Sequence, residues 1–151
     1  MSLSKDGLVS DLDAIYSKFV RMRDSDHNGW GKCITCSRMV RWDEADCGHF
    51  ISRKHLSTRY FELNTFLQCR ECNRLNNGRD EKYAAELTNR YGDEFIPWLW
   101  RLAHTPVKFD RFWYDEKIGY YAQGAGLIER IHRRGQSVPG ELFIWDQNFC
   151  W

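Results

Sequence analysis

Two short cysteine motifs bracket the segment of the chain that is richest in residues able to do chemistry: C-I-T-C at residues 33–36 and C-R-E-C at residues 69–72. Four thiolates in two C-x-x-C pairs can close a tetrahedral zinc site. The first residues lack the basic patch and apolar stretch of a secretion signal, which favours metal binding over disulfide bonds. We therefore predict a structural zinc site on Cys33, Cys36, Cys69 and Cys72, with disulfide pairing of these cysteines as the alternative.

An aspartate, a histidine and two asparagines lie within this bracket or directly after it. A neutral imidazole can take a proton from water near pH 7, so His49 is the candidate general base. Asn73 follows the fourth cysteine and offers an amide oxygen, a ligand that Mg²⁺ or Mn²⁺ accepts. Asn64 is expected to hydrogen-bond backbone and to brace the hairpin that carries His49. Asp46 either binds the catalytic metal or only orients this hairpin, and both roles stay open.

These groups together match what a one-metal phosphodiesterase requires: a base, an orienting amide and a metal-binding amide. Each also has a structural alternative, because a lone histidine more often belongs to a core and asparagine is a good helix cap. The structural interpretation is the one we apply to His27, His104 and His132.

Basic residues outnumber acidic ones between residues 49 and 79. A local excess of positive charge beside a candidate site suits a ligand that carries phosphate groups. A solvated polar loop has the same composition and is the alternative. The predicted DNA contacts are Arg53, Lys54, His55, Arg59 and Arg74.

The hydrophobic pattern predicts a series of short elements around these residues. Apolar positions three and four apart indicate a helix over residues 8–23, and polar–apolar alternation indicates a β-hairpin within residues 33–52. The elements expected next are a basic loop over 53–60, an extended piece over 64–68, and a helix that begins near residue 72, is interrupted at 76–78 and resumes over 79–91.

The rest of the chain is predicted to be helical and rich in aromatic residues. Gly92 suits the end of one helix and Asp93 the start of the next, over residues 94–104. The aromatic residues over 108–121 are expected to pack a helix onto the core, with a base-stacking platform as the alternative. Residues 123–126 (Q-G-A-G) are expected to break the chain before the tail.

The length of 151 residues fits a single domain. We divide it into an N-terminal helix and turn at 7–32, a zinc-bound core at 33–92, and a helical, aromatic-rich extension at 93–151. The sequence has no run of about 18 apolar residues, so no transmembrane helix is expected.

The order C-x2-C, D-x-G-H, N-x4-C-x2-C-N resembles the zinc-stabilised form of the HNH, or ββα-metal, endonuclease motif. More narrowly, the stretch from residue 33 to about residue 92 is similar to the NinG (Rap) family of phage recombination endonucleases. Beyond about residue 100 the chain shows no such resemblance. The residues that carry it are Cys33, Ile34, Cys36, Asp46, Gly48, His49, Phe50, Arg59, Tyr60, Phe61, Asn64, Gln68, Cys69, Cys72, Asn73, Gly78, Tyr83, Glu86, Leu87 and Gly92.

The resemblance implies an α+β fold in which a small zinc-stabilised ββα-metal core carries flanking α-helices. It implies a metal-dependent DNA endonuclease that hydrolyses phosphodiester bonds, contains structural zinc and uses Mg²⁺ or Mn²⁺ for catalysis. The substrate it implies is branched DNA, such as a Holliday junction or a D-loop, which we expect a homodimer to cut. Its place would be the cytoplasm of a bacterial host, with the gene carried by a phage or prophage.

Two other functions stay open. One is a non-catalytic, zinc-stabilised DNA-binding module, which would not need His49. The other is a restriction-like or nonspecific HNH nuclease. Many HNH enzymes carry a metal-binding carboxylate directly before the histidine, where this chain has Gly48. We expect this glycine to let the backbone approach the metal or the phosphate closely.

Overall fold

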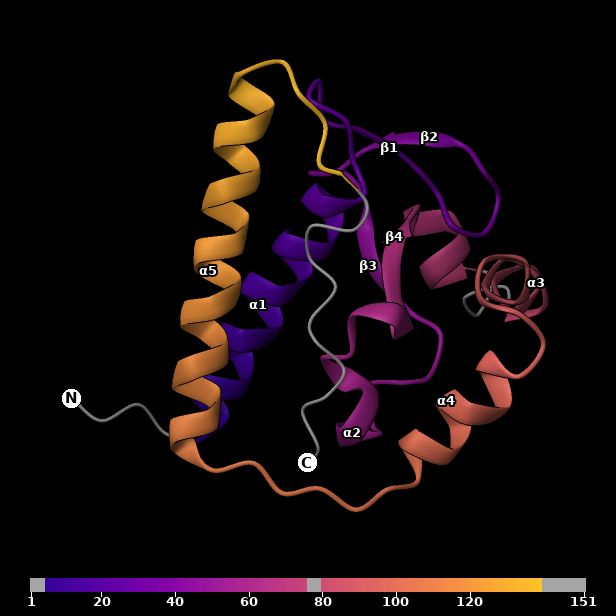
Figure 1. Ribbon diagram of the computed structural model, residues 1–151, viewed down its shortest axis with the longest axis vertical. Coiled ribbons are helices and arrows are strands. Elements are labelled where there is room, and N and C mark those ends of the chain that lie inside the picture. The colour runs from indigo at the N-terminus through magenta and orange to yellow at the C-terminus, as the bar shows by residue number, and fades with distance from the viewer. Residues whose placement is uncertain (1–4, 76–79, 140–151) are drawn as a thin grey trace.

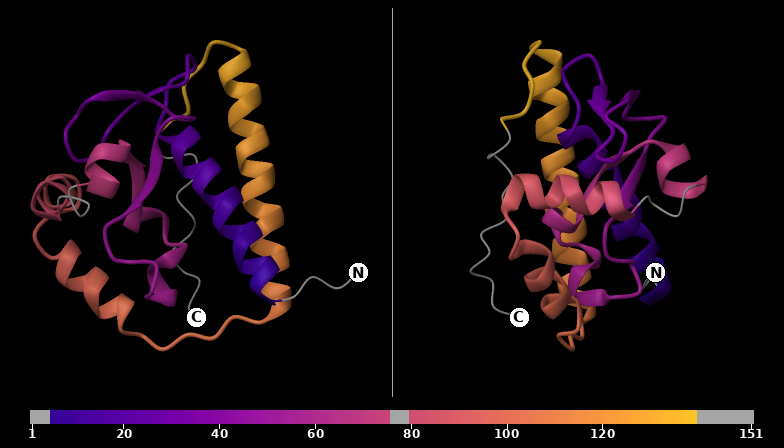
Figure 2. Two further views of the ribbon diagram at one scale, coloured as in Figure 1. Left: turned by 180° about the vertical axis from the view of Figure 1, so that it is seen from behind. Right: turned by 90° about the vertical axis from the view of Figure 1, so that its right-hand side faces the viewer.

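The computed structural model of the protein describes residues 5–75 and 80–139, and it has the mixed α+β character that was predicted. Two long helices, α1 (Lys5–Arg23) and α5 (Arg111–Arg133), lie side by side and form one side of the molecule (Figure 1). Short strands occupy the middle, and smaller helices form the opposite side. In Figure 2, α3 (Asp80–Tyr91) runs across the direction of α5 rather than along it.

Helix α1 confirms the helix predicted from apolar spacing and begins slightly earlier, at Lys5. Its buried face includes Leu8, Leu12 and Phe19, none of which is more than 2% exposed. This stripe at intervals of three and four residues is what an amphipathic helix turns toward a core. The last turn carries Arg21 and Arg23, which suits the negative end of the helix dipole.

Four strands form two separate antiparallel pairs. The first pairs β1 (Trp30–Lys32) with β2 (Met39–Arg41), and the second pairs β3 (Asp46–His49) with β4 (Thr65–Gln68). The prediction of one hairpin within residues 33–52 was therefore wrong. The first cysteine motif forms the tip of a hairpin that already begins at Trp30. The partner of β3 is instead β4, whose four residues are all buried and which follows β3 after a connection of 15 residues.

The segment between β3 and β4 is more ordered than the predicted basic loop. It contains the single-turn helix α2 (Leu56–Arg59) and the 3₁₀ turn η1 (Glu62–Asn64). Ser57 and Thr58 are buried, with exposures of 2% and 0%. Small side chains with local hydrogen-bonding hydroxyls pack easily beneath a tight turn, which the overall basic composition of the stretch concealed.

After β4 the chain forms the π-helical turn η2 (Glu71–Leu75), then α3 and α4 (Phe95–Ala103). The predicted interruption at residues 76–78 lies outside the described residues. Gly92 ends α3 as predicted, with φ of 88° and its N–H donating to Thr88 at 2.8 Å. Asp93 is not the cap of α4. Glu94 takes that position without a side-chain hydrogen bond, and the N–H of Phe95 donates to the Gly92 carbonyl.

Helix α5 is continuous, so the break predicted at residues 123–126 was wrong. Gly124 and Ala125 are buried along the face of α5 that packs on α1. Small residues at such a contact let two helices approach closely, which offsets the low helix propensity of glycine. At the other end, Asp110 caps α5 by accepting a hydrogen bond from the N–H of Trp113 at 2.8 Å.

The main hydrophobic core lies between α1 and α5. The expectation that the aromatic residues of 108–121 pack a helix onto the core is confirmed by Phe109, Tyr114 and Tyr121, all at most 7% exposed. A second apolar cluster joins β4 to α3 through Phe66, Tyr83 and Leu87, together with Ile34. In the described parts of the chain, no helix is long and apolar enough to cross a membrane.

Candidate functional site

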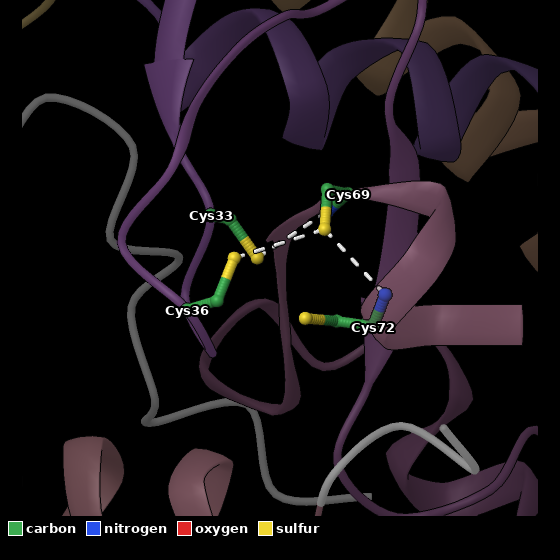
Figure 3. A group of neighbouring side chains, drawn as sticks. All are labelled: Cys33, Cys36, Cys69 and Cys72. Atoms are coloured by element: carbon green, nitrogen blue, oxygen red, sulfur yellow. Dashed lines mark hydrogen bonds between the residues drawn. The ribbon is translucent and has the colours of Figure 1, made fainter. Parts of the chain in front are cut away.

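The two cysteine motifs meet in space. Their four sulfur atoms, on Cys33, Cys36, Cys69 and Cys72, all lie within 4.8 Å of one another. Figure 3 shows them pointing toward one common point, two from the β1–β2 connection and two from the chain after β4. None of these cysteines is in a disulfide. Strand β4 brings the two motifs together: the Ile34 N–H donates to the Leu67 carbonyl at 3.0 Å, and this bond places the first motif beside β4.

Backbone geometry shapes both motifs for a metal. Ser37 adopts a left-handed conformation, with φ of 63°, which lets its N–H donate to the Cys33 carbonyl at 3.0 Å. Further N–H groups point at sulfur: that of Cys69 at Cys33 Sγ (3.3 Å) and that of Cys72 at Cys69 Sγ (3.5 Å). Such donors stabilise thiolates, the form in which cysteine binds a metal.

The cluster fits a zinc ion. A tetrahedral site with Zn–S distances of about 2.3 Å requires sulfur–sulfur distances of roughly 3.8 Å, and Cys36 Sγ lies 3.8 Å from Cys69 Sγ. Burial opposes ionisation of Cys36, yet the Arg38 N–H and the neighbouring thiols lower its pKa. These four side chains can therefore hold a structural zinc. Cys47 lies apart from them, and burial raises its pKa to about 12, which makes it a packing residue.

His49 stands at the end of β3, opposite Thr65 of β4. Its Nε2 lies 2.9 Å from the carbonyl oxygen of Arg59. Since a carbonyl can only accept, this contact favours the tautomer that carries its proton on Nε2 and has Nδ1 as the basic nitrogen. Burial lowers the pKa of His49 to about 4, and the backbone at Arg59 and Cys47 only partly opposes this effect. The imidazole is therefore neutral at pH 7.

Asn64 ties together the loop on which His49 depends. Its Oδ1 accepts from the Ile51 N–H at 2.8 Å, and its Nδ2 donates to the carbonyls of Ile51 and Thr58, both at 3.0 Å. The side chain is fully buried, at 0% exposure. An amide that satisfies three backbone groups in this way joins the end of β3 to α2. Through these contacts Asn64 braces the loop between β3 and α2.

Asp46 and Asn73 lie together at the other end of β3. Asn73 Nδ2 donates to Asp46 Oδ2 at 2.9 Å, which directs the Asn73 Oδ1 away from the carboxylate. Arg74 also holds Asp46, with Nε and a terminal nitrogen at 2.7 and 2.6 Å from its two oxygens. Burial opposes ionisation of Asp46, but hydrogen bonds from Arg74 and Asn73 keep its pKa below the ordinary value.

The structure does not bring His49 into contact with Asp46 and Asn73. Asp46 and His49 are three residues apart on one strand, and successive side chains of a strand point to opposite faces. Among the described residues, no hydrogen bond links His49 with Asp46 or Asn73. The predicted site therefore consists of two parts, a histidine at one end of β3 and oxygen ligands at the other.

The expectation that Gly48 opens its backbone to a metal or a phosphate does not match the packing around it. The Gln68 side chain fills the space where a Cβ would stand, with Gln68 Cβ only 2.8 Å from that position. Gln68 Nε2 donates to Thr35 Oγ1 at 2.6 Å, inside the first cysteine motif. On the other side, the Tyr83 hydroxyl donates to the Gly48 carbonyl at 2.8 Å. Gly48 thus serves packing between the metal centre and α3.

The predicted DNA-contacting residues have different surroundings. Arg59 pairs with Asp13 of α1, and Arg53 Nη1 lies 3.9 Å from the same carboxylate. His55 packs against α4, where its Nδ1 lies 3.3 Å from the Ala103 carbonyl. Lys54 is exposed on the loop, and Arg74 holds Asp46 as described above.

Asp13 is the residue near the histidine that the sequence analysis missed. It receives hydrogen bonds from Arg59 and from the hydroxyl of Tyr60, at 2.9 Å for the latter. Its place in α1, between buried Leu12 and buried Tyr16, marks it only as an acid at the edge of an apolar stripe. Nothing in the spacing along the chain connects it to a residue 36 positions later, because only folding brings α1 beside α2.

The fold and the cysteine cluster define a small α+β protein with a four-cysteine site that joins two antiparallel strand pairs. A family model described as Bacteriophage Lambda NinG protein matches residues 4–130, and the chain belongs to this phage protein family. The match reaches well beyond the stretch of 33–92 on which the resemblance was based, and includes α1 and most of α5. No curated protein and no solved structure matches the chain.

Proposed function

We propose that the protein is a metal-dependent DNA endonuclease of the HNH type that hydrolyses phosphodiester bonds in phage recombination. The observation that carries the proposal is the state of His49. Its ring is neutral at pH 7, and the Arg59 carbonyl favours the Nε2–H tautomer, in which Nδ1 is the nitrogen that takes a proton from water in this proposal. The Asn64 brace supports the same interpretation, because a general base must be held in a defined orientation.

The proposed catalytic cation is Mg²⁺ or Mn²⁺, held by oxygens of Asn73 and Asp46. A carboxylate and an amide oxygen fit a hard divalent cation. Arg74 occupies the Asp46 carboxylate, so a cation ligated by Asp46 must displace its guanidinium; the Arg74 side chain is 60% exposed and has room to move. The Asn73 amide, whose Nδ2 now donates to Asp46, must also turn to offer its oxygen to the same cation. A bound cation would stabilise the charge on the phosphate as the bond breaks. The four cysteines are proposed to hold structural zinc.

In the proposed reaction, His49 takes a proton from the attacking water, and Asn64 keeps the loop in place while it does so. Because the proposed cation site lies at the opposite end of β3 from His49, the reaction requires both to reach one phosphate group of the bound DNA. Branched DNA, such as a Holliday junction or a D-loop, is the proposed substrate, because membership of the NinG family supports a role in recombination. Cutting a junction needs two nearly simultaneous incisions, so a homodimer is part of the proposal.

The test is gel-resolved cleavage of a four-way junction and a linear duplex of matched sequence, with Mg²⁺ or Mn²⁺ at low salt. We expect His49→Ala to lower the cleavage rate about 10²- to 10⁴-fold, while zinc content, folding and DNA binding stay unchanged. His27→Ala is the matched control, since His27 is exposed and lies outside the bracketed segment. The cation should be omitted in the negative control, because a strong chelator would also remove zinc.

The outcomes separate the candidate functions. A zinc-loaded wild type that binds DNA without cutting either substrate would replace the proposal with a non-catalytic DNA-binding module. Equal cutting of junction and duplex would indicate a nonspecific HNH nuclease. A His49→Ala variant that cuts as fast as wild type would rule out His49 as the base.

A further inference from the structure

The carbonyl that orients His49 belongs to the peptide group between Arg59 and Tyr60, and one carboxylate holds the side chains of both residues. Asp13 of α1 accepts two hydrogen bonds from the Arg59 guanidinium, with Nε 3.0 Å from Oδ1. It accepts a third from the Tyr60 hydroxyl at 2.9 Å. The peptide group is therefore tied to α1 through the residues on both of its sides.

Other contacts hold the turn itself: the N–H of this peptide group, on Tyr60, donates to the Thr58 carbonyl, whereas Asp13 ties the side chains on both sides of it to α1. The Arg59 guanidinium also donates to the Arg53 carbonyl, but at 3.4 Å. The Tyr60 ring packs edge-on against Tyr16, with ring centroids 5.5 Å apart. This packing holds the Tyr60 ring, whereas the Asp13 carboxylate orients the Tyr60 hydroxyl and the Arg59 guanidinium. A two-pronged pair between a guanidinium and a carboxylate is directional as well as strong.

We propose that Asp13 is a positioning residue for His49: by anchoring Arg59 and Tyr60, it keeps the Arg59 carbonyl where it holds the imidazole as its Nε2–H tautomer. The consequence for catalysis rests on the proposed function, whereas the consequence for the tautomer does not. Arg59 then serves the histidine rather than a DNA phosphate, because its guanidinium is paired with Asp13.

The state of Asp13 agrees with this role. Its side chain is 23% exposed, so the ion pair is partly shielded from water. Burial raises its pKa, but the hydrogen bonds from Arg59 and Tyr60 outweigh burial and leave the pKa below the ordinary value. The group is therefore a carboxylate at neutral pH and accepts from both partners.

The experiment compares Asp13→Asn and Asp13→Ala with wild type in the full-length, zinc-loaded protein. Nitrogen-15 NMR of the histidine side chains reports which ring nitrogen of His49 carries the proton. We expect Nε2–H alone in wild type and a mixture of tautomers in both variants. In the junction-cleavage assay we expect kcat to fall about 10- to 100-fold, as for a misplaced catalytic group, with KM for DNA changed by less than about twofold.

The matched control is Asp11→Asn, which removes an exposed acid from the same helix and should leave both readouts unchanged. Thermal unfolding and zinc content show whether each variant is folded. If Asp13→Ala does not fold, Tyr60→Phe removes one of the three hydrogen bonds while keeping the ring, and should shift the tautomer in the same direction by less.

Either readout can overturn the inference. A His49 that stays entirely Nε2–H in folded Asp13→Ala means that Asp13 does not position it. A changed tautomer with an unchanged kcat means that the contact has no part in catalysis. If the wild type cleaves no DNA at all, the proposed function fails on its own, and the tautomer measurement still decides whether Asp13 positions the ring.

Discussion

His49 shows how a single side chain acquires its chemistry from its surroundings. An imidazole in water has a pKa of about 6.5 and is partly protonated at neutral pH. In this fold burial lowers the pKa of His49 to about 4, and one carbonyl selects the tautomer. Both effects come from atoms outside the motif, at Arg59 and in the packing beneath β3. The residue type alone could not determine either.

The lowered pKa predicts the pH dependence of cleavage. The base is active when neutral, so activity should persist as the pH falls below 6.5 and disappear only as it passes through about 4. A pH–rate profile at saturating cation, together with an NMR titration of His49, measures this. An acidic limb with a midpoint near 6.5 would show that the ring is not desolvated.

The same shift affects stability. Because the folded-state pKa of His49 lies below the value of about 6.5 in an unfolded chain, the stability that it contributes is present above that pH. This stability declines as the pH falls toward about 4. Melting temperatures over this interval should therefore decrease for wild type more than for His49→Ala.

At the scale of elements, the four-cysteine cluster connects pieces that are weak alone. The β1–β2 pair has only three residues in each strand, and two-stranded ribbons are marginally stable by themselves. The cysteines tie this pair to the chain that leaves β4, and Gln68 adds a bond to Thr35 within the first motif. The cysteine cluster thereby supports β4, the partner of the strand that carries His49.

We predict that Cys72→Ser loses zinc and much of its stability. Structural zinc supplies roughly 10–16 kcal/mol of apparent binding energy in small zinc-dependent peptides, so losing one ligand should cost several kcal/mol here. Zinc content by atomic absorption and urea unfolding provide the measurement. Cys47→Ser is the control: it should keep about one zinc per chain, since Cys47 lies outside the cluster. Equal zinc content in both variants would refute the four-cysteine site.

At the scale of the whole molecule, the helices α1 and α5 hold the two ends of the described chain together. Their contact encloses the main core. In this core the ring centroids of Tyr16 and Phe19 lie 4.8 and 5.0 Å from that of Tyr121. The same α1 presents Asp13 to α2. Helix packing far from the cysteines therefore sets the surroundings of the candidate base.

Neighbouring residues on α5 allow a direct test of this core. Ile128 is fully buried at 0% exposure, whereas Leu127 is 36% exposed. We expect Ile128→Ala to lower the free energy of unfolding by about 2–5 kcal/mol, and Leu127→Ala to change it by less than about 1 kcal/mol. Urea unfolding curves measure both. Similar losses for the two variants would mean that α5 does not pack on α1 through this face.

Local patterns in the sequence determined the parts of the structure that depend on neighbours along the chain. Apolar spacing predicted α1, Gly92 predicted the end of α3, and the two C-x-x-C motifs predicted the cluster of four thiols. Each is governed by a rule that operates over a few residues: helical periodicity, left-handed backbone at a helix end, and the geometry of a thiolate pair.

Apart from the two cysteine motifs, only the tertiary structure decided which distant segments meet. It paired β3 with β4 rather than with the nearer strand, kept α5 continuous through Gly124, and placed Asp13 against Arg59. These outcomes depend on competition for burial among segments far apart in the sequence, and a local pattern carries no information about which partner wins. The cysteines were evident from their spacing, whereas the surroundings of His49 arose from packing.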